Sequence, residues 1–206
     1  MGFDSMTRTA ILIDGGHLRT VARRQGHIYD PDFIEAFAHL CALDDEEVIR
    51  VFYYDCPPYS GKVHLPISGD ICAYEANGAW LFELARRDLF AVRKGELKFR
   101  GFALKEPPQK RMARNKALTD EDFRPVFQQK GVDMRIGMDI AMLASRGRIG
   151  RIVLVSGDTD CVPAMKHARI EGLQVAIVRI DGNLLSRTLQ WHSDHVRNVN
   201  LKDLTA

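Results

Sequence analysis

The sequence lacks the features that would place it in a specialised class of protein. It has only four cysteines, Cys41, Cys56, Cys72 and Cys161, and they show neither CxxC nor Cys/His zinc spacing. We therefore expect reduced thiols in a cytoplasmic protein. No apolar run is long enough to span a bilayer, and the first residues have no secretory apolar core. The phosphate-binding motifs GxxxxGK[ST] and GxGxxG are missing too, so nucleotide-binding folds of those types are unsupported.

The charge is small overall and uneven along the chain. The 206 residues carry a net charge of +2, with 46% hydrophobic and 27% charged residues, which fits one globular α/β domain with an insertion. From Arg86 to Lys116 there are eleven Lys/Arg and three Asp/Glu, so this segment has a charge of +8 and the rest has −6. The segment either holds a nucleic-acid backbone, with Phe90, Phe99 and Phe102 available to stack on bases, or is a solvated hairpin and loop.

Short apolar runs that end in carboxylates organise the chain. Residues 152–155 (IVLV) are typical of a strand buried on both faces, and the sequence SGDTD follows at once. Residues 9–13 (TAILI) form a second such run, which ends at Asp14. Further strands are expected at 47–55 and 175–178. Strands alternating with helices predict a mostly parallel sheet covered on both faces, with ligands at its C-terminal edge.

The remaining elements are predicted from periodicity and from Gly/Pro signals. Helices are expected over 31–43 (with Asp30 as N-cap), 71–90, 119–129, 134–146 and 184–191. Residues 56–69 and 105–116 are expected to be loops, 91–104 a hairpin and 195–199 an edge strand. Residues 1–8 are expected to be a disordered N-terminus or a cloning remnant. Residues 9–206 are then a single domain with a basic hairpin and loop insertion around 91–118.

Acidic residues compete for one site at the predicted sheet edge: Asp14, Asp55, the pair Asp133/Asp139 and the pair Asp158/Asp160. Crowded carboxylates repel one another, and a hard cation such as Mg²⁺ or Mn²⁺ relieves that repulsion. Six residues of helix turn through about 600°, so Asp133 and Asp139 do not share a face, and we expect one ligand and one supporting residue from them.

Structural roles are the alternative for each of these groups. Asp133, Asp158 and Asp160 can each cap a helix, and Asp55 is interpreted as a turn residue. His17 is interpreted as a local hydrogen-bonding residue, because no second histidine lies at ligand spacing.

Three motifs together resemble the NYN domain, and more narrowly its LabA/DUF88 branch, which is related to PIN nucleases. They are IDGGH at 13–17, KGVD at 130–133 followed by Asp139, and SGDTD at 156–160 followed by Pro163. The resemblance implies a PIN-like three-layer α/β/α fold with a mostly parallel central sheet, and divalent-metal ribonuclease chemistry. It also implies a catalytic acidic site made of Asp14, Asp133, Asp139, Asp158 and Asp160. The family usually has Asn where this chain has His17.

The predicted function is therefore a metal-dependent endoribonuclease that uses Mg²⁺ or Mn²⁺. Asp14, Asp133, Asp158 and Asp160 are the expected metal ligands, with His17, Ser156 and Thr159 supporting them. The expected RNA-binding residues are Lys105, Lys110, Arg111, Arg114, Lys116 and Lys130.

Two other functions compete with this prediction. One is a non-catalytic RNA-binding or regulatory module that retains the acidic pocket. The other, an aspartyl phosphatase, is disfavoured because Gly16 stands where such enzymes have a second Asp. The expected partner is RNA. No association with a membrane is expected, and a homodimer is one option for the oligomeric state.

Overall fold

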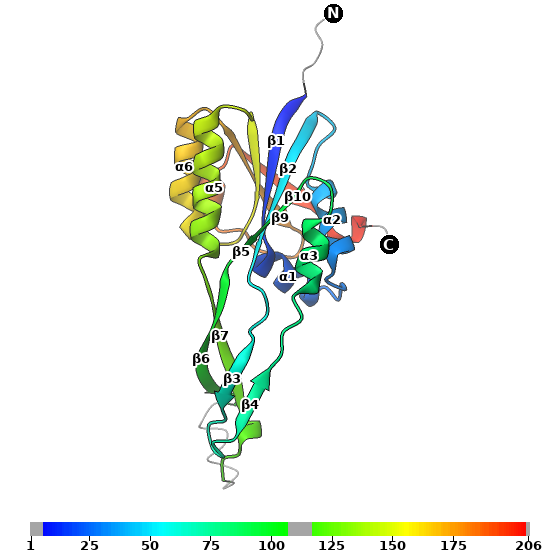
Figure 1. Ribbon diagram of the computed structural model, residues 1–206. Coiled ribbons are helices and arrows are strands. Elements are labelled where there is room, and N and C mark those ends of the chain that lie inside the picture. The colour runs from blue at the N-terminus through cyan, green and yellow to red at the C-terminus, as the bar shows by residue number, and fades with distance from the viewer. Residues whose placement is uncertain (1–5, 107–116, 205–206) are drawn as a thin grey trace, which may run out of the picture. The chain divides into compact units, whose positions relative to one another are not determined.

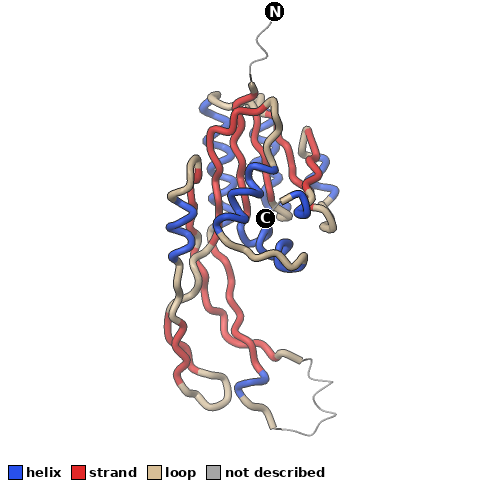
Figure 2. The backbone as a smooth tube through the Cα atoms, turned by 90° about the vertical axis from the view of Figure 1, so that its right-hand side faces the viewer, coloured by secondary structure: helices blue, strands red, loops and turns tan. Residues whose placement is uncertain are grey.

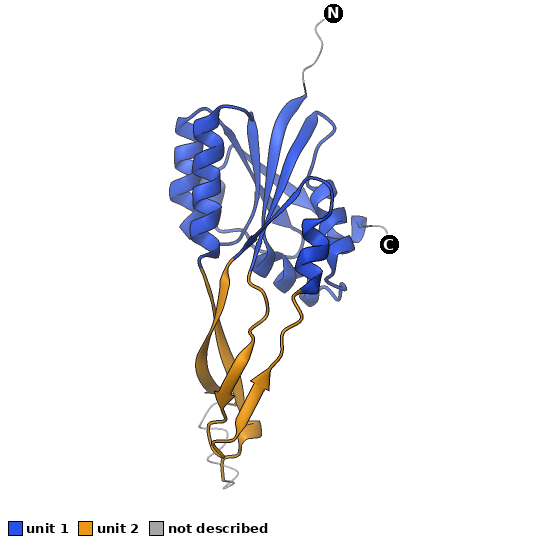
Figure 3. Cartoon of the chain, in the orientation of Figure 1, with its two compact units in different colours: residues 1–55, 79–94, 131–206 blue, residues 56–78, 95–130 orange. Residues whose placement is uncertain are grey.

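The computed structural model describes residues 6–106 and 117–204, and these form two compact units (Figures 1 and 3). Unit 1 comprises residues 1–55, 79–94 and 131–206, and unit 2 comprises residues 56–78 and 95–130. None of the described helices is long and apolar enough to cross a membrane.

Unit 1 is built on a six-stranded sheet in which all neighbouring strands are parallel. In spatial order the strands are β10 (His195–Val199), β9 (Gln174–Ile180), β8 (Arg151–Val155), β1 (Thr7–Asp14), β2 (Glu46–Asp55) and β5 (Phe90–Lys94). Figure 2 shows these strands side by side, with helices packed against them. The apolar runs predicted at 9–13, 47–55, 152–155 and 175–178 are thus confirmed as strands of a parallel sheet, as is the edge strand at 195–199.

Helices cover both faces of this sheet. One face carries α1 (Gly15–Arg24), α2 (Pro31–Leu40) and α3 (Ala79–Ala85), and the other carries α5 (Val132–Arg146) and α6 (Val162–Ile170) (Figure 1). Alternate strand residues such as Ile11 and Ile13 belong to one core cluster with residues of α1 and α2, whereas Leu12, which lies between them, is equally buried and faces the other layer. This explains the continuous apolar runs, and it confirms the predicted PIN-like α/β/α architecture.

The strand order reverses between β1 and β8. From β1 the chain adds β2 and then β5 on one side; it returns to place β8 on the other side of β1, and continues outward to β9 and β10. Ligands of open α/β sheets bind beyond the carboxyl ends of the strands at such a reversal. In this chain, Asp14 ends β1 and Ser156 directly follows β8.

The predicted helix ends have physical support. Asp30 caps α2 by accepting a hydrogen bond from the Phe33 amide at 2.8 Å. Gly147 ends α5 in the left-handed region, with φ of 58°, directly after the predicted helix 134–146. The last helix, α7 (Arg187–Trp191), is shorter than the predicted 184–191.

The prediction of a helix over 71–90 is wrong. Residues Ile71–Tyr74 form strand β4, which pairs antiparallel with β3 (Gly61–His64) inside the predicted loop 56–69. Only Ala79–Ala85 are helical, and Phe90 already begins β5. Phe90 is therefore buried in the core of unit 1 and is not available to a base. An apolar run broken by Gly78 fitted a helix period, but pairing with a partner strand determined its conformation.

The predictions of a hairpin at 91–104 and of a helix at 119–129 are also wrong. Residues 91–94 belong to the parallel sheet, whereas β6 (Glu96–Leu104) pairs antiparallel with β7 (Phe123–Lys130). Only a 3-10 turn, η1 (Asp120–Asp122), is helical, and the Thr119 amide donates to the Asp122 carboxylate at 2.8 Å ahead of it. The partner strand of β6 comes after residues 107–116 in the sequence, and a local pattern cannot reveal a partner so far along the chain.

Unit 2 has its own small aromatic core. The rings of Tyr59, Tyr74 and Phe127 lie 5.3 to 5.8 Å apart between centroids, and Phe99 packs on Phe102 at 5.1 Å. These contacts join the β3–β4 pair to the β6–β7 pair. Phe99 and Phe102, predicted to stack on bases, are half-buried in this cluster.

A buried ion-pair network stabilises unit 1 at Glu46, the first residue of β2. The Glu46 carboxylate has no exposed side-chain surface and accepts from Arg151 and Arg197, and also from the Leu43 amide at 3.0 Å. Burial raises the pKa of Glu46, but the hydrogen bonds from Arg197, Arg151 and Leu43 outweigh it and hold that pKa at about 2.

We expect Glu46→Gln to lower the free energy of unfolding by about 3–5 kcal/mol, because two buried guanidinium groups lose their counter-charge. The exposed neighbouring variant Glu47→Gln is the matched control and should change stability by less than about 0.5 kcal/mol. Urea unfolding of all three proteins measures the difference.

The same network predicts a pH dependence. Because the folded pKa of Glu46 lies below the unfolded value, its contribution is present above about pH 4.5 and is lost as the pH falls toward about 2. Wild type should lose more stability than Glu46→Gln over this range. Parallel losses in both proteins would contradict the assigned role.

Candidate active site

Asp14 is placed by the junction of β1 and α1. It is the last residue of the strand and the N-cap of the helix, and its Oδ1 accepts from the His17 amide at 3.1 Å. The pKa of Asp14 is raised to about 6, mainly by burial; the His17 and Gly16 amides lower it, while the charges of Asp133 and Asp55 raise it. A nearby cation would stabilise the ionised form of a carboxylate in this environment.

Close packing requires a glycine directly after Asp14, at Gly15. A Cβ on Gly15 would lie 2.3 Å from the Tyr53 hydroxyl and 2.9 Å from Oδ2 of Asp55. No side chain larger than hydrogen fits there without displacing Tyr53, which itself donates to Asp55 at 3.0 Å.

Asp55 has a structural role that the sequence did not indicate. It is fully buried at the end of β2 and pairs with Arg19 of α1, so its interpretation as a turn residue is wrong. The hydroxyl of Tyr29 extends the network to Tyr53 at 2.7 Å. This buried group of polar side chains lies against Gly15 and fixes the turn that carries Asp14.

The loop after β8 positions Asp158. The buried Ser156 hydroxyl accepts from the Asp158 amide at 3.0 Å, and Asp158 Oδ1 accepts from the Asp160 amide at 2.8 Å. Asp158 thus caps the 3-10 turn η2 (Thr159–Cys161) while remaining partly exposed. Thr159 and Asp160 are exposed. Asp158 therefore has the capping role, and its role as a metal ligand stays a prediction.

His17 joins the first motif to the third. A Cβ on Gly157 would lie 2.8 Å from Cε1 and 2.9 Å from Nδ1 of the His17 ring, so the imidazole packs directly on that glycine. Burial lowers the pKa of His17, which favours the neutral ring. His17 is therefore a packing partner of the Asp158 loop as well as the residue whose amide binds Asp14.

Asp133 approaches from α5. The N-cap is Gly131, in the left-handed region with φ of 75°, so Asp133 lies inside the first turn and is not the cap. The pKa of Asp133 is raised by burial and by the charges of Asp158 and Asp160. Asp14, Asp133, Asp158 and Asp160, from three separate segments, thus form one electrostatically coupled set, which we call the acidic cluster.

Asp139 lies two turns further along α5 in a different environment. It is buried, and its Oδ2 accepts from the Tyr54 hydroxyl and from Nε of Arg93, both at 2.9 Å. The Arg93 guanidinium also lies over the Phe52 ring at 5.1 Å. Asp139 therefore anchors α5 to β2 and β5, and its place in the catalytic site stays a prediction. Sequence reasoning missed Tyr54 and Arg93, since no local pattern links them to Asp139.

The donor set suits a hard cation bound through few protein ligands. Within residues 6–106 and 117–204, no three His, Cys, Asp or Glu side chains are gathered closely enough to enclose a metal ion. Mg²⁺ commonly uses one or two carboxylates and keeps several waters, so the coupled oxygens of Asp14, Asp133 and Asp158 fit it. The pKa values of Asp14 and Asp133 are raised by burial and further by neighbouring carboxylates, and such an ion relieves that repulsion.

The predicted RNA-binding residues divide into two groups. Lys105, just after β6, and Lys130, the last residue of β7, are both exposed in unit 2. Lys110, Arg111, Arg114 and Lys116 lie outside the described residues.

With this geometry in view, the comparison with known families is decisive. The model of the NYN domain matches residues 8–199, nearly the whole chain. The chain belongs to the NYN domain family. The narrower placement in the LabA/DUF88 branch stays a prediction.

A solved structure supports the fold of this NYN-domain protein. A crystal structure of a protein of unknown function from Vibrio parahaemolyticus matches with a TM-score of 0.55 and 17% identity, over 96% of each chain. At that identity the likeness concerns the fold alone. No curated protein matches the chain.

The environment of Asp14 predicts a pH-dependent effect of Asp14→Asn on the metal-free protein. Asparagine keeps the N-cap but removes the charge. Because the folded pKa of about 6 exceeds the unfolded value of 3.8, ionised Asp14 destabilises the fold increasingly as the pH rises through 6. With EDTA, the variant should match wild type at about pH 4 and be more stable by about 1–3 kcal/mol at about pH 8.

Denaturant unfolding at the two pH values measures this effect. Asp44→Asn, an exposed carboxylate in the turn before β2 at the opposite sheet edge, is the matched control and should behave like wild type. Lower stability of Asp14→Asn at the higher pH would instead indicate that the charge itself is a required hydrogen-bond acceptor.

Proposed function

We propose that this NYN-domain protein is a divalent-metal-dependent endoribonuclease. The observation that carries the proposal is the acidic cluster at the reversal of strand order. Its carboxylates come from the end of β1, the start of α5 and the loop after β8. Beyond the effect of burial, the charge of Asp133 raises the pKa of Asp14, and the charges of Asp158 and Asp160 raise the pKa of Asp133. Keeping such repulsion in a folded protein costs stability, which favours a functional reason for it.

The proposal gives each residue a role. Asp14, Asp133 and Asp158 would hold Mg²⁺ or Mn²⁺ with the help of Asp160, and Asp139 positions α5 through Tyr54 and Arg93. His17, Ser156 and Thr159 support the two loops. A bound divalent ion lowers the pKa of the water molecule that it coordinates, and it neutralises negative charge on a phosphodiester. The chain's own part is to fix the carboxylates at the sheet edge and to hold them partly out of water.

Asp14→Asn separates this function from a structural role. It should abolish metal-dependent cleavage of single-stranded RNA, because a hard anionic ligand is lost. Mn²⁺ at about 100 times its dissociation constant should stabilise wild type by about 2.7 kcal/mol and the variant much less. The measurements are a cleavage assay and melting curves with EDTA and with Mn²⁺.

Asp44→Asn again serves as the control, and it should cleave RNA and respond to Mn²⁺ as wild type does. An equal response of Asp14→Asn and wild type to Mn²⁺ would show that Asp14 is not a ligand and would remove the central residue of the proposal.

Unit 2 offers a surface that suits the RNA backbone. On β6 the exposed Lys98 and Arg100 alternate with half-buried Leu97 and Phe99, and on β7 the exposed Arg124 lies on the same strand as exposed Lys130. On this outer face the cations outnumber Glu96, the single acid of β6 and β7, which lies opposite Lys130 and pairs with Lys98 at 3.4 Å. The aromatic side of the hairpin packs into unit 2. We call Lys98, Arg100, Arg124 and Lys130 the basic ribbon.

Charge reversal on the basic ribbon tests its contact with phosphates. Lys98→Glu and Lys130→Glu should each weaken RNA binding and reduce the slope of log affinity against log salt by about 1. Lys166→Glu, an exposed lysine of α6 in unit 1, is the matched control. Filter binding at several salt concentrations measures the slopes, and unchanged slopes would favour a merely solvated hairpin.

The second candidate function is an RNA-binding module without catalysis. One observation favours it, namely that no three metal-ligating side chains of the described residues are gathered together. It predicts RNA binding that depends on the basic ribbon, with no cleavage in Mg²⁺ or Mn²⁺. The cleavage assay above therefore distinguishes the two functions.

A further inference from the structure

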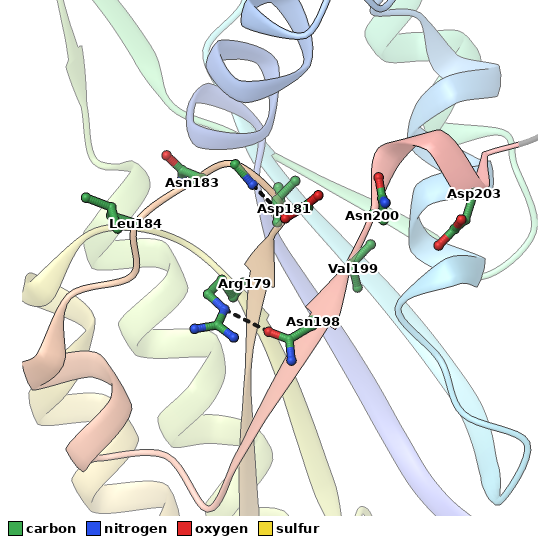
Figure 4. Close-up of a pocket in the computed structure, with 10 residues that line it drawn as sticks. Arg179, Asp181, Asn183, Leu184, Asn198, Val199, Asn200 and Asp203 are labelled. Carbon is green, nitrogen blue, oxygen red and sulfur yellow. Dashed lines mark hydrogen bonds between the residues drawn. The ribbon is translucent and has the colours of Figure 1, made fainter.

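A cavity of about 510 Å³ lies at the C-terminal ends of β9 and β10, away from the acidic cluster described above (Figure 4). Its polar lining consists of Arg179, Asp181, Asn183, Asn198, Asn200 and Asp203. Leu184 and Val199 add apolar surface, and Leu184 is 99% exposed. The volume is typical of a small-molecule subsite.

The lining side chains are held in place and still offer free hydrogen-bonding capacity. Nε of Arg179 donates to Oδ1 of Asn198 at 2.7 Å, across directly paired positions of the two strands (Figure 4). Oδ1 of Asn200 accepts from the Lys202 amide at 3.0 Å. Because each asparagine uses its oxygen in these bonds, its NH₂ group remains a donor toward a ligand.

The chemistry of the lining favours a nucleoside over a phosphate. The two carboxylates, Asp181 and Asp203, outnumber the single guanidinium of Arg179, so an anion gains little in this cavity. Carboxylates accept hydrogen bonds from sugar hydroxyls, as an acidic residue does for ribose in dinucleotide-binding folds. The NH₂ groups of the asparagines and the guanidinium of Arg179 can donate to acceptors on base edges. The exposed Leu184 can contact the face of a base.

The position of the cavity connects it with the acidic cluster. Both lie beyond the C-terminal ends of strands of one parallel sheet, and β8 and β9 are neighbours. With strands about 4.8 Å apart, the midpoint of β9 and β10 lies about 10 Å from the midpoint of β1 and β8. A strand that presents a phosphodiester to Asp14 and Asp158 can therefore reach the cavity with a flanking nucleoside.

We infer that this cavity binds a ribonucleoside unit of the RNA strand, and that one of the two carboxylates, Asp181 or Asp203, accepts from its 2′-hydroxyl and so selects RNA over DNA. The inference rests on the proposed function for the identity of the strand. A 2′-hydroxyl is the group by which a protein distinguishes RNA from DNA at a given site.

The test pairs each carboxylate with the hydroxyl that it would bind. The full chain is titrated in EDTA, where no cleavage occurs, with a single-stranded oligoribonucleotide and with its 2′-deoxy and 2′-fluoro counterparts. Wild type should bind the ribonucleotide about tenfold more tightly than either counterpart, as expected for a hydrogen bond to a charged acceptor.

Asp181→Asn and Asp203→Asn are compared with the control Asp44→Asn. At least one of the first two should lose the RNA preference while its affinity for the 2′-deoxy strand stays unchanged. A merely structural effect would lower affinity for all three strands equally. An undiminished preference in both variants, or a changed oligomeric state without a changed preference, would overturn the inference.

Failure of the proposed function gives a different result. If wild type does not cleave RNA in Mn²⁺ but Asp181→Asn or Asp203→Asn loses the 2′-hydroxyl preference, the cavity assignment stands and the nuclease proposal fails. If cleavage is normal and the preference is unchanged in both variants, only the cavity assignment fails.

Discussion

The burial of one carboxylate, that of Asp14, constrains the turn after β1 and, through His17, the loop after β8. It lies at the end of the central strand, where the sheet reverses its order, and it must cap α1 at the same time. Gly15 is needed because the polar network of Tyr53, Asp55 and Arg19 fills the space beneath the turn. Gly157 is needed because the His17 ring lies against it. Two loops are thus shaped around one partly desolvated acid.

Two groups of charged residues lie at opposite ends of the sheet, and they affect its stability in opposite ways. Glu46, at the start of β2, is fully compensated by two arginines, and its pKa is therefore lowered. The pKa values of Asp14 and Asp133, at the other edge, are raised mainly by burial and further by acidic neighbours. The first arrangement stabilises the fold, and the second leaves uncompensated charge for a ligand. The contrast favours a functional reading of the acidic cluster.

The second unit is stabilised separately, by aromatic packing among Tyr59, Tyr74, Phe99 and Phe127. Because its rings face inward, the alternation along β6 and β7 leaves cations on the outside. The apolar residues first considered as a platform for bases are mainly a small core. The charged face is the better candidate for contact with a nucleic acid.

The sequence by itself determined five of the six strands of the parallel sheet in unit 1, the N-cap of α2, the C-terminal end of α5 and the order of the three acidic motifs, because buried strands and helix ends have strong local signatures. Only the tertiary structure decided that residues 71–74 are a strand, that β6 pairs with β7 and that Asp139 pairs with Arg93 and Tyr54. The tertiary structure also gave Asp55 a buried partner and gathered the cavity beside β9 and β10. Each of these depends on a partner distant in sequence, and the energy of pairing or burial with that partner outweighs the local preference of the segment.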